Sequence, residues 1–252
     1  MLAGLADPVV NLTLMFTELP LLQRPAAAKQ AGFERVELWW PFGSCSRPTH
    51  SQVQAFIHAV KTAEVELVHM NLFTGDTVAG ERGIASHPER VSEFRDSLTA
   101  AITIGSQLGT KLFNVHYGHC LPGVDPGLIA DTGAANLRFA ADTVAEIGGT
   151  ILIEALSGWP LYPITTTTQA VKVINRMRSA GVSNIAYLLD QYHLVTNGED
   201  VFDSVTRYAS YVAHVQIADS PGRHEPGTGC FDFSRWLPLQ LSPGAWCMDR
   251  PR

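Results

Sequence analysis

Three side chains in the second half of the sequence are of types that could bind a metal ion. Glu154, Asp190 and Gln216 lie within the strand-like runs TILIEAL, IAYLLD and VAHVQIAD. A carboxylate in so apolar a run is costly to bury without a partner. Two carboxylates and an amide oxygen are hard ligands, which suit Mg²⁺ or Mn²⁺ better than a softer metal. One such residue alone would suggest an ordinary buried polar group, but three at the same ends of consecutive strands favour a divalent-metal site.

Four further side chains could contact a substrate. Arg223 lies in the glycine- and proline-rich sequence SPGRHEPGTG (residues 220–229), and Arg82 lies in a second loop-like stretch, residues 74–87. A guanidinium can hold a carboxylate through two parallel hydrogen bonds, although a solvated loop arginine is the alternative for both. His193 follows Asp190 by three residues and could contact a substrate oxygen or only cap the loop, and His116 is a weaker candidate.

The elements that would position these side chains alternate along the chain. Expected strands cover residues 9–16, 35–40, 65–73, 111–117, 150–156, 185–190 and 213–219. Expected helices cover residues 21–31, 51–64, 88–109, 126–147, 168–180 and 200–210, and a last helix begins within residues 231–237. Residue 51, a serine, is the expected N-cap of the second helix. Seven such repeats call for a parallel sheet, and the carboxyl ends of parallel strands commonly carry the active site.

The fold class predicted is α/β, a (β/α)8 TIM barrel formed as a single domain over residues 1–252. A length of about 250 residues is typical of that barrel. An open, doubly wound sheet is the alternative, but it usually has a glycine-rich phosphate loop after its first strand. Here that place holds TELP (residues 17–20), which has no glycine. Only AWCMD (residues 245–249) could form strand eight, so the barrel could be incomplete at its eighth strand and helix.

Composition narrows the function classes. The net charge of −6 and the lack of a basic tract argue against nucleic acid as a partner. No run of about 18 apolar residues occurs, so no membrane span is predicted. The four cysteines are scattered without a CxxC pair, which suggests reduced thiols and a cytoplasmic location. A small molecule is therefore the expected partner, and a homo-oligomer is left open.

Five sequence blocks resemble those of the hydroxypyruvate isomerase family, a branch of the xylose-isomerase-like TIM barrels. They are GFERVELWWPF (residues 32–42), NLFTGDTVAGERG (71–83), LIEAL (152–156), LLDQYH (188–193) and HVQIADSPGRHEPGTG (214–229). The similarity runs in order from about residue 11 to residue 236. The last block is quite specific to the branch, whereas LIEAL and LLDQYH alone would mark only the superfamily.

The resemblance implies an aldose–ketose type isomerisation of a sugar acid, hydroxypyruvate to tartronate semialdehyde, at one divalent metal ion. Members of the superfamily use two glutamates, on strands five and eight, with an Asp and a Gln or His between them. Glu154, Asp190 and Gln216 match the first three of these positions. His193 and Arg223 match the family's histidine after strand six and its arginine in the strand-seven loop.

The C-terminus departs from the family's pattern. The family ends strand eight in a Gly-x-Glu-Tyr type motif, whereas this chain has GAWCMDRPR, a divergent or truncated ending. Asp249 is the candidate to replace the missing glutamate as fourth metal ligand and second catalytic carboxylate, beside Glu154. Two alternatives stay open: a catalytically impaired barrel that binds a sugar acid or a partner, and a ketose 3-epimerase.

Overall fold

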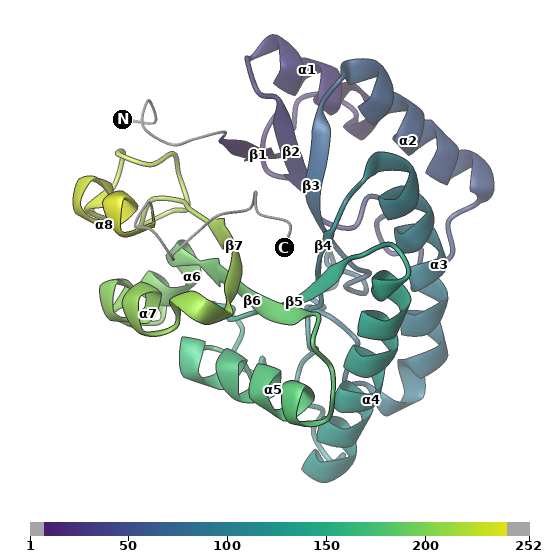
Figure 1. Ribbon diagram of the computed structural model, residues 1–252, viewed down its shortest axis with the longest axis vertical. Helices are drawn as coiled ribbons and strands as arrows, with labels where there is room; N and C mark the ends of the chain where they lie inside the picture. The colour runs from purple at the N-terminus through teal and green to yellow at the C-terminus, as the bar shows by residue number, and fades with distance from the viewer. Residues whose placement is uncertain (1–7, 241–252) are drawn as a thin grey trace. The chain divides into compact units, whose positions relative to one another are not determined.

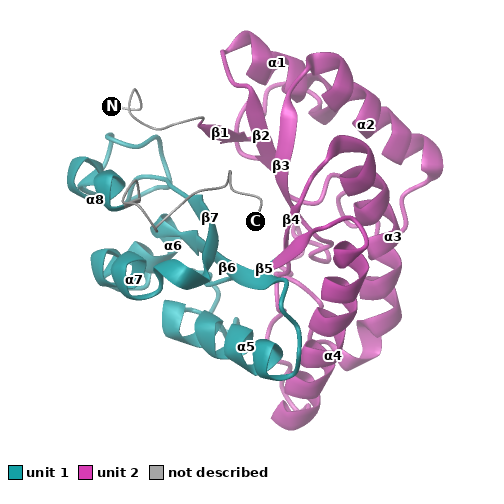
Figure 2. Ribbon diagram, viewed as in Figure 1, with its two compact units in different colours: residues 1–5, 152–252 teal, residues 6–151 magenta. Residues whose placement is uncertain are grey.

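The computed structural model describes residues 8–240. Within that range the chain forms two compact units (Figure 2). Residues 8–151, magenta in the figure and labelled unit 2 there, are called the first unit in chain order, and residues 152–240, teal, are called the second unit. Both units are built from β-strands followed by helices, as the alternating sequence pattern predicts. The candidate strand at residues 245–249, and with it Asp249, lies outside the described residues.

The first unit holds four strands that pair in parallel and in chain order. They are β1 (Val9–Asn11), β2 (Arg35–Leu38), β3 (Glu66–Asn71) and β4 (Leu112–Asn114) (Figure 1). Its helices are η1 (Leu21–Gln23), α1 (Arg24–Gln30), α2 (His50–Ala63), η2 (Pro88–Arg90), α3 (Val91–Leu108) and α4 (Pro126–Ala145). Most residues of β2 and β3 are buried, which fits strands covered on both faces.

Most elements of this unit are shorter than predicted, and two of the differences have a clear physical reason. Helix α2 begins one residue earlier than expected, because Thr49 and not the serine is its N-cap, in a capping box with Gln52. Strand β1 has three residues where eight were expected. It ends because the backbone turns at Asn11, whose carbonyl accepts from the N–H groups of Leu14 and Met15. The Asn11 side chain also accepts from the N–H of Thr13, at 2.9 Å.

The second unit contains the later strands, in the order β5, β6, β7. These are β5 (Thr150–Glu154), whose first two residues belong to the first unit, β6 (Ile185–Asp190) and β7 (Val212–Gln216). The helices are α5 (Thr167–Ser179), α6 (Gln191–Thr196), α7 (Val201–Arg207), η3 (Ala209–Tyr211) and α8 (Phe233–Gln240). Helix α8 is anchored by the buried Trp236, whose indole N–H donates to the carbonyl of Val201 at 3.1 Å.

The short helix α6 was not expected from the sequence. It follows β6 without a connecting loop, because Asp190 is both the last residue of the strand and the N-cap of the helix. The carboxylate of Asp190 accepts from the backbone N–H of His193 at 3.2 Å, which satisfies a free donor of the first helical turn. His193 is therefore held on a helix beside the strand end.

Among residues 8–240, no helix combines the length and apolar character that a bilayer span requires.

Candidate active site

The candidate site lies at the carboxyl ends of the strands of the second unit. Glu154 ends β5 and Asp190 ends β6, and their side chains are almost fully buried, with 3% and 1% of each residue exposed. Oxygens of these two carboxylates and a ring nitrogen of His193 all lie within 4.8 Å of one another. Gln216 is the last residue of β7 and pairs with Asp190 on the neighbouring strand β6. The structure thus brings Glu154, Asp190 and His193 together and places the backbone of Gln216 next to Asp190.

Each oxygen of Asp190 has a different hydrogen-bond donor. Oδ1 accepts from the backbone N–H of His193, and Oδ2 accepts from Nη2 of Arg223 at 2.6 Å. The bond to Arg223 joins two charged groups, so it is stronger than a bond between neutral partners. A buried carboxylate needs such a partner, and here the predicted substrate-binding arginine supplies it.

The imidazole of His193 lies between the two carboxylates and the arginine. Its Nε2 is 3.7 Å from Asp190 Oδ2 and 3.9 Å from Glu154 Oε1. The same Nε2 is 2.8 Å from Nη1 of Arg223. On the other side of the ring, Nδ1 is 3.1 Å from the backbone N and 2.8 Å from Oγ of Ser157.

Arg223 reaches these groups from the loop after β7. Its backbone has a φ of 58°, in the left-handed region that few side chains adopt. Its guanidinium lies over the ring of Tyr192, with Cζ 5.1 Å from the ring centroid. About a quarter of the side chain is exposed, so the arginine lies at the solvent edge of the group. Its position is compatible with contact to a ligand that enters from solvent.

The loop that carries Arg223 is organised around the buried carboxylate of Asp219. Oδ1 accepts from the backbone N–H groups of Ser220 (2.9 Å) and Phe231 (3.2 Å), and Oδ2 accepts from that of Gly227 (2.7 Å). Burial alone would raise the pKa of Asp219, but backbone N–H donors, including that of Gly229, together hold the pKa below its ordinary value. A Cβ on Gly229 would lie 2.5 Å from Asp219 Oδ1, so this approach requires glycine.

Arg82 and His116, also predicted to contact substrate, lie in the first unit. The guanidinium of Arg82 donates to the carbonyls of Thr77 (3.2 Å) and Glu81 (2.6 Å), and its partial burial lowers its pKa. His116 is buried. The neighbouring Gly83 passes so close to the His116 backbone that a Cβ would lie 2.1 Å from the His116 carbonyl oxygen. Their contacts with substrate stay predictions.

Comparison with known proteins identifies the family. The family model described as a xylose isomerase-like TIM barrel matches residues 25–239. The chain belongs to the xylose isomerase-like TIM barrel family. This membership confirms the fold class predicted from the sequence. A solved barrel, described as an AP endonuclease of family 2 from Brucella melitensis, has a TM-score of 0.83 and 30% identity, covering 94% of this chain and 89% of the other.

Two relatives of this xylose isomerase-like barrel are similar along most of their length. A putative hydroxypyruvate isomerase of Streptomyces coelicolor is 39% identical, over 93% of this chain and 90% of the relative. The hydroxypyruvate isomerase of Escherichia coli is 35% identical, over 88% of this chain and 83% of the relative. These similarities confirm the branch of the family that the five sequence blocks indicated, and with it that the chain is an isomerase-type enzyme.

The donor set of this barrel fits a divalent cation. Two buried carboxylates within a few ångströms of each other repel when both are ionised, and a bound cation would remove that repulsion. Oxygen donors from Glu154 and Asp190 suit a hard metal, and an imidazole is also a ligand of many divalent ions. The structure therefore has a buried acidic and histidine group able to bind metal, at the place where the sequence predicted one.

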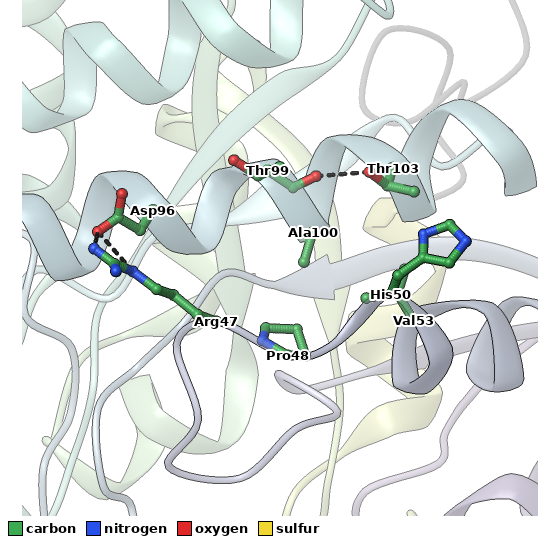
Figure 3. Close-up of a pocket in the computed structure, with 8 residues that line it drawn as sticks. All are labelled: Arg47, Pro48, His50, Val53, Asp96, Thr99, Ala100 and Thr103. Atoms are coloured by element: carbon green, nitrogen blue, oxygen red, sulfur yellow. Dashed lines mark hydrogen bonds and ion pairs between the residues drawn. The ribbon is translucent and has the colours of Figure 1, made fainter.

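A surface groove in the first unit contains none of the predicted site residues. It runs between the start of α2 and the helix α3 (Figure 3) and is lined by Arg47, Pro48, His50, Val53, Asp96, Thr99, Ala100 and Thr103. Its one charged pair, Arg47 with Asp96, is an exposed ion pair. Exposed pairs of this kind contribute little energy, and the groove offers no arrangement of groups for catalysis.

Two residues that shape the site were missed from the sequence, Ser157 and Asp219. Asp219 had a usable signal, since an aspartate directly before a Ser-Pro-Gly turn commonly accepts hydrogen bonds from the loop that follows. Ser157 had none, because its partner His193 is 36 residues away in the sequence.

Proposed function

We propose that this chain isomerises small hydroxy-oxo acids, and that its substrate is hydroxypyruvate, which it converts to tartronate semialdehyde. The observation that carries the proposal is the buried group of Glu154, Asp190 and His193 with Arg223 at its solvent edge. The group combines a candidate base, a metal-compatible carboxylate pair and a cation for an acidic substrate. The two hydroxypyruvate isomerase relatives support the choice of substrate.

The reaction moves protons without changing the overall composition of the substrate. One proton leaves the hydroxymethyl carbon and one is delivered to the neighbouring carbonyl carbon, while the hydroxyl proton passes to the former carbonyl oxygen. Glu154 is the proposed base that removes the carbon-bound proton. A second carboxylate delivers the proton to the other carbon, and Asp249 is its candidate.

The remaining side chains bind and orient. Glu154, Asp190 and Gln216, with Asp249 as fourth ligand, are the proposed ligands of Mg²⁺ or Mn²⁺; when bound, the ion stabilises negative charge on the substrate oxygens. Arg223 is proposed to bind the substrate carboxylate, with Arg82 and His116 as further contacts. His193 is proposed to donate a hydrogen bond to a substrate oxygen. We also propose that the enzyme works in the cytoplasm, without nucleic acid or membrane as partner.

Isomerase activity on hydroxypyruvate tests the proposal directly. We expect turnover with added Mg²⁺ or Mn²⁺ and its loss with EDTA. Asp249→Asn is expected to lower kcat by about 10²–10⁴-fold if Asp249 supplies the second carboxylate. Asp142→Asn, an exposed aspartate on α4, is the matched control and should leave turnover unchanged.

Two other results would each favour a different function. Turnover of a ketohexose but not of hydroxypyruvate would identify a ketose 3-epimerase. No turnover of either, in protein shown by circular dichroism to be folded, would favour a catalytically impaired barrel that binds a sugar acid or a partner.

A further inference from the structure

The loop that follows β5 contacts the imidazole of His193 through two atoms of one residue. Ser157 is buried, three residues beyond Glu154. Its backbone N lies 3.1 Å from His193 Nδ1, and its Oγ lies 2.8 Å from the same nitrogen. The backbone N–H can only donate, so Nδ1 must accept. The hydroxyl can also donate to Nδ1, since its hydrogen rotates freely.

A ring nitrogen that accepts a hydrogen bond carries no hydrogen. Neutral imidazole has one N–H group and one acceptor nitrogen, and the protonated ring has two N–H groups and no acceptor. With Nδ1 as the acceptor, the ring is neutral and its hydrogen is on Nε2. The Nε2–H faces the space beside Asp190 Oδ2 and Glu154 Oε1, which are 3.7 and 3.9 Å away.

The contact between His193 and Arg223 competes with this arrangement. Nη1 of Arg223 lies 2.8 Å from Nε2, and a guanidinium can only donate. A neutral imidazole cannot accept at both nitrogens, so one of the two contacts must yield. The Ser157 donor belongs to the backbone, whereas the Arg223 donor is at the end of a flexible, partly exposed side chain. Arg223 is therefore the group expected to move.

The backbone of Ser157 is braced against the helix that carries His193. The carbonyl of Leu156 accepts from Nδ2 of Asn197 at 3.0 Å, and Asn197 is the C-cap of α6. The same Nδ2 donates to the carbonyl of Thr165 at 2.7 Å. Helix α6 is thus tied to the β5 loop at two points, at His193 and at its C-cap Asn197. The N–H of Ser157 consequently keeps its direction relative to the imidazole.

We infer that Ser157 is a positioning residue, which holds His193 in the tautomer with hydrogen on Nε2. In this tautomer Nε2 has no lone pair for a metal ion and cannot act as a base. His193 is then a hydrogen-bond donor to a substrate oxygen, and metal binding is left to the oxygen ligands. The consequence for catalysis rests on the proposed isomerase function, but the tautomer itself does not.

The tautomer can be measured directly in metal-free protein. Two-bond ¹H–¹⁵N correlation spectra of protein labelled with ¹⁵N-histidine distinguish protonated from unprotonated ring nitrogens. The protein has nine histidines, and His193→Gln identifies the signals of His193 by their loss. We expect an unprotonated Nδ1 and a protonated Nε2. A protonated Nδ1 would overturn the inference, whatever the enzyme does with hydroxypyruvate.

Two substitutions separate the backbone donor from the hydroxyl. Ser157→Ala keeps the N–H and should keep the Nε2–H tautomer, with kcat reduced only a few-fold. Ser157→Pro removes the N–H and should give a mixture of tautomers, with kcat lower by up to about 10²-fold, the size expected for loss of one aligned donor. If the proline variant does not fold, the spectrum of the unmodified protein still decides the question.

A double-mutant cycle tests whether Ser157 acts through His193. If it does, Ser157→Pro should have almost no further effect on kcat in the His193→Gln background, because the group it orients is absent. If the two substitutions instead lower kcat independently, so that their fold-changes multiply in the double variant, Ser157 does not act through His193. That result would overturn the positioning role.

Discussion

At the scale of single residues, the site is a small set of charged and polar groups that lie close together. The buried carboxylates of Glu154 and Asp190 lie within 4.8 Å of each other and of a ring nitrogen of His193. Two carboxylates this close repel each other when both are ionised, which favours binding of a cation. Arg223 reaches the group with two nitrogens, because Nη2 donates to Asp190 and Nη1 lies 2.8 Å from His193 Nε2.

Metal binding should therefore stabilise the protein through these two carboxylates. We expect Mn²⁺ to raise Tm, by an amount equivalent to about 2.7 kcal/mol when the free metal is 100 times its Kd. Glu154→Gln and Asp190→Asn should each lose most of this shift, and Glu154→Gln should also lower kcat by about 10²–10⁴-fold. Thermal unfolding with Mn²⁺ and with EDTA measures the shift. An equal shift in all three proteins would place the metal elsewhere.

Replacing Arg223 should affect substrate binding more than the chemical step. Arg223→Lys keeps the charge but loses the paired donors, so we expect KM for hydroxypyruvate to rise about 10-fold, with kcat changed less. Arg207→Lys, at an exposed position on α7, is the matched control. Steady-state kinetics at saturating metal give both constants. A fall in kcat at unchanged KM would instead assign Arg223 to the transition state.

At the scale of elements, the loop after β7 depends on one anchor. Asp219 collects backbone N–H groups from both ends of the loop, residues 220 to 231, and the loop holds Arg223 at the site. A buried carboxylate with several donors is stabilising only while it is ionised. An asparagine has the same shape, but its NH₂ group would face one of these backbone N–H donors. That N–H would then have no acceptor.

Asp219→Asn should thus lower the free energy of unfolding by about 1–3 kcal/mol near neutral pH. The pKa of Asp219 is lower in the folded state than its ordinary value of 3.8. The ionised carboxylate therefore contributes fully to the free energy of unfolding above pH 3.8, and this contribution is lost as the pH falls through the lower pKa of the folded state. The difference between the two proteins should therefore shrink below pH 3.8. Urea unfolding from pH 7 down to pH 3 measures it. A difference that stays constant over this range would contradict the role of ionised Asp219.

At the scale of the whole molecule, the net charge predicts that nucleic acid is not a partner of this barrel. The chain carries 18 basic and 24 acidic side chains. The solved barrel from Brucella melitensis is described as an AP endonuclease, which is a statement about that protein. Binding to a polyanion draws on clusters of Lys and Arg, and this sequence has none.

We therefore expect no measurable binding to duplex DNA, with or without an abasic site, at physiological salt. Fluorescence anisotropy with labelled DNA, in Mg²⁺ and in EDTA, measures it, and a basic DNA-binding domain serves as positive control. Binding in the micromolar range that weakens steeply with added salt would be evidence for nucleic acid as a partner.

Much of the fold could be predicted because the governing signals are local. Apolar runs bounded by glycine predicted the strands, and β6 was predicted to the residue, at Ile185–Asp190. Glu154, Asp190 and Gln216 were found because a carboxylate or amide stands out in an otherwise apolar run. The family was predicted from the five sequence blocks that resemble those of hydroxypyruvate isomerases, two of which contain Glu154 and Asp190. Formation of a single domain over residues 1–252, and the role of Asp249, stay predictions.

The tertiary structure decided the features that depend on distant partners. The sequence by itself determined which residue types stand at the strand ends, since strand and helix periodicity depend on near neighbours. It did not determine that α6 follows directly on Asp190, that β1 ends at Asn11, or that Ser157 donates to His193. Backbone turns and long-range hydrogen bonds depend on chain segments brought together only by folding. For this reason the sequence could name candidate ligand residues, whose metal binding stays a prediction, and could not name Ser157 as a group that contacts His193.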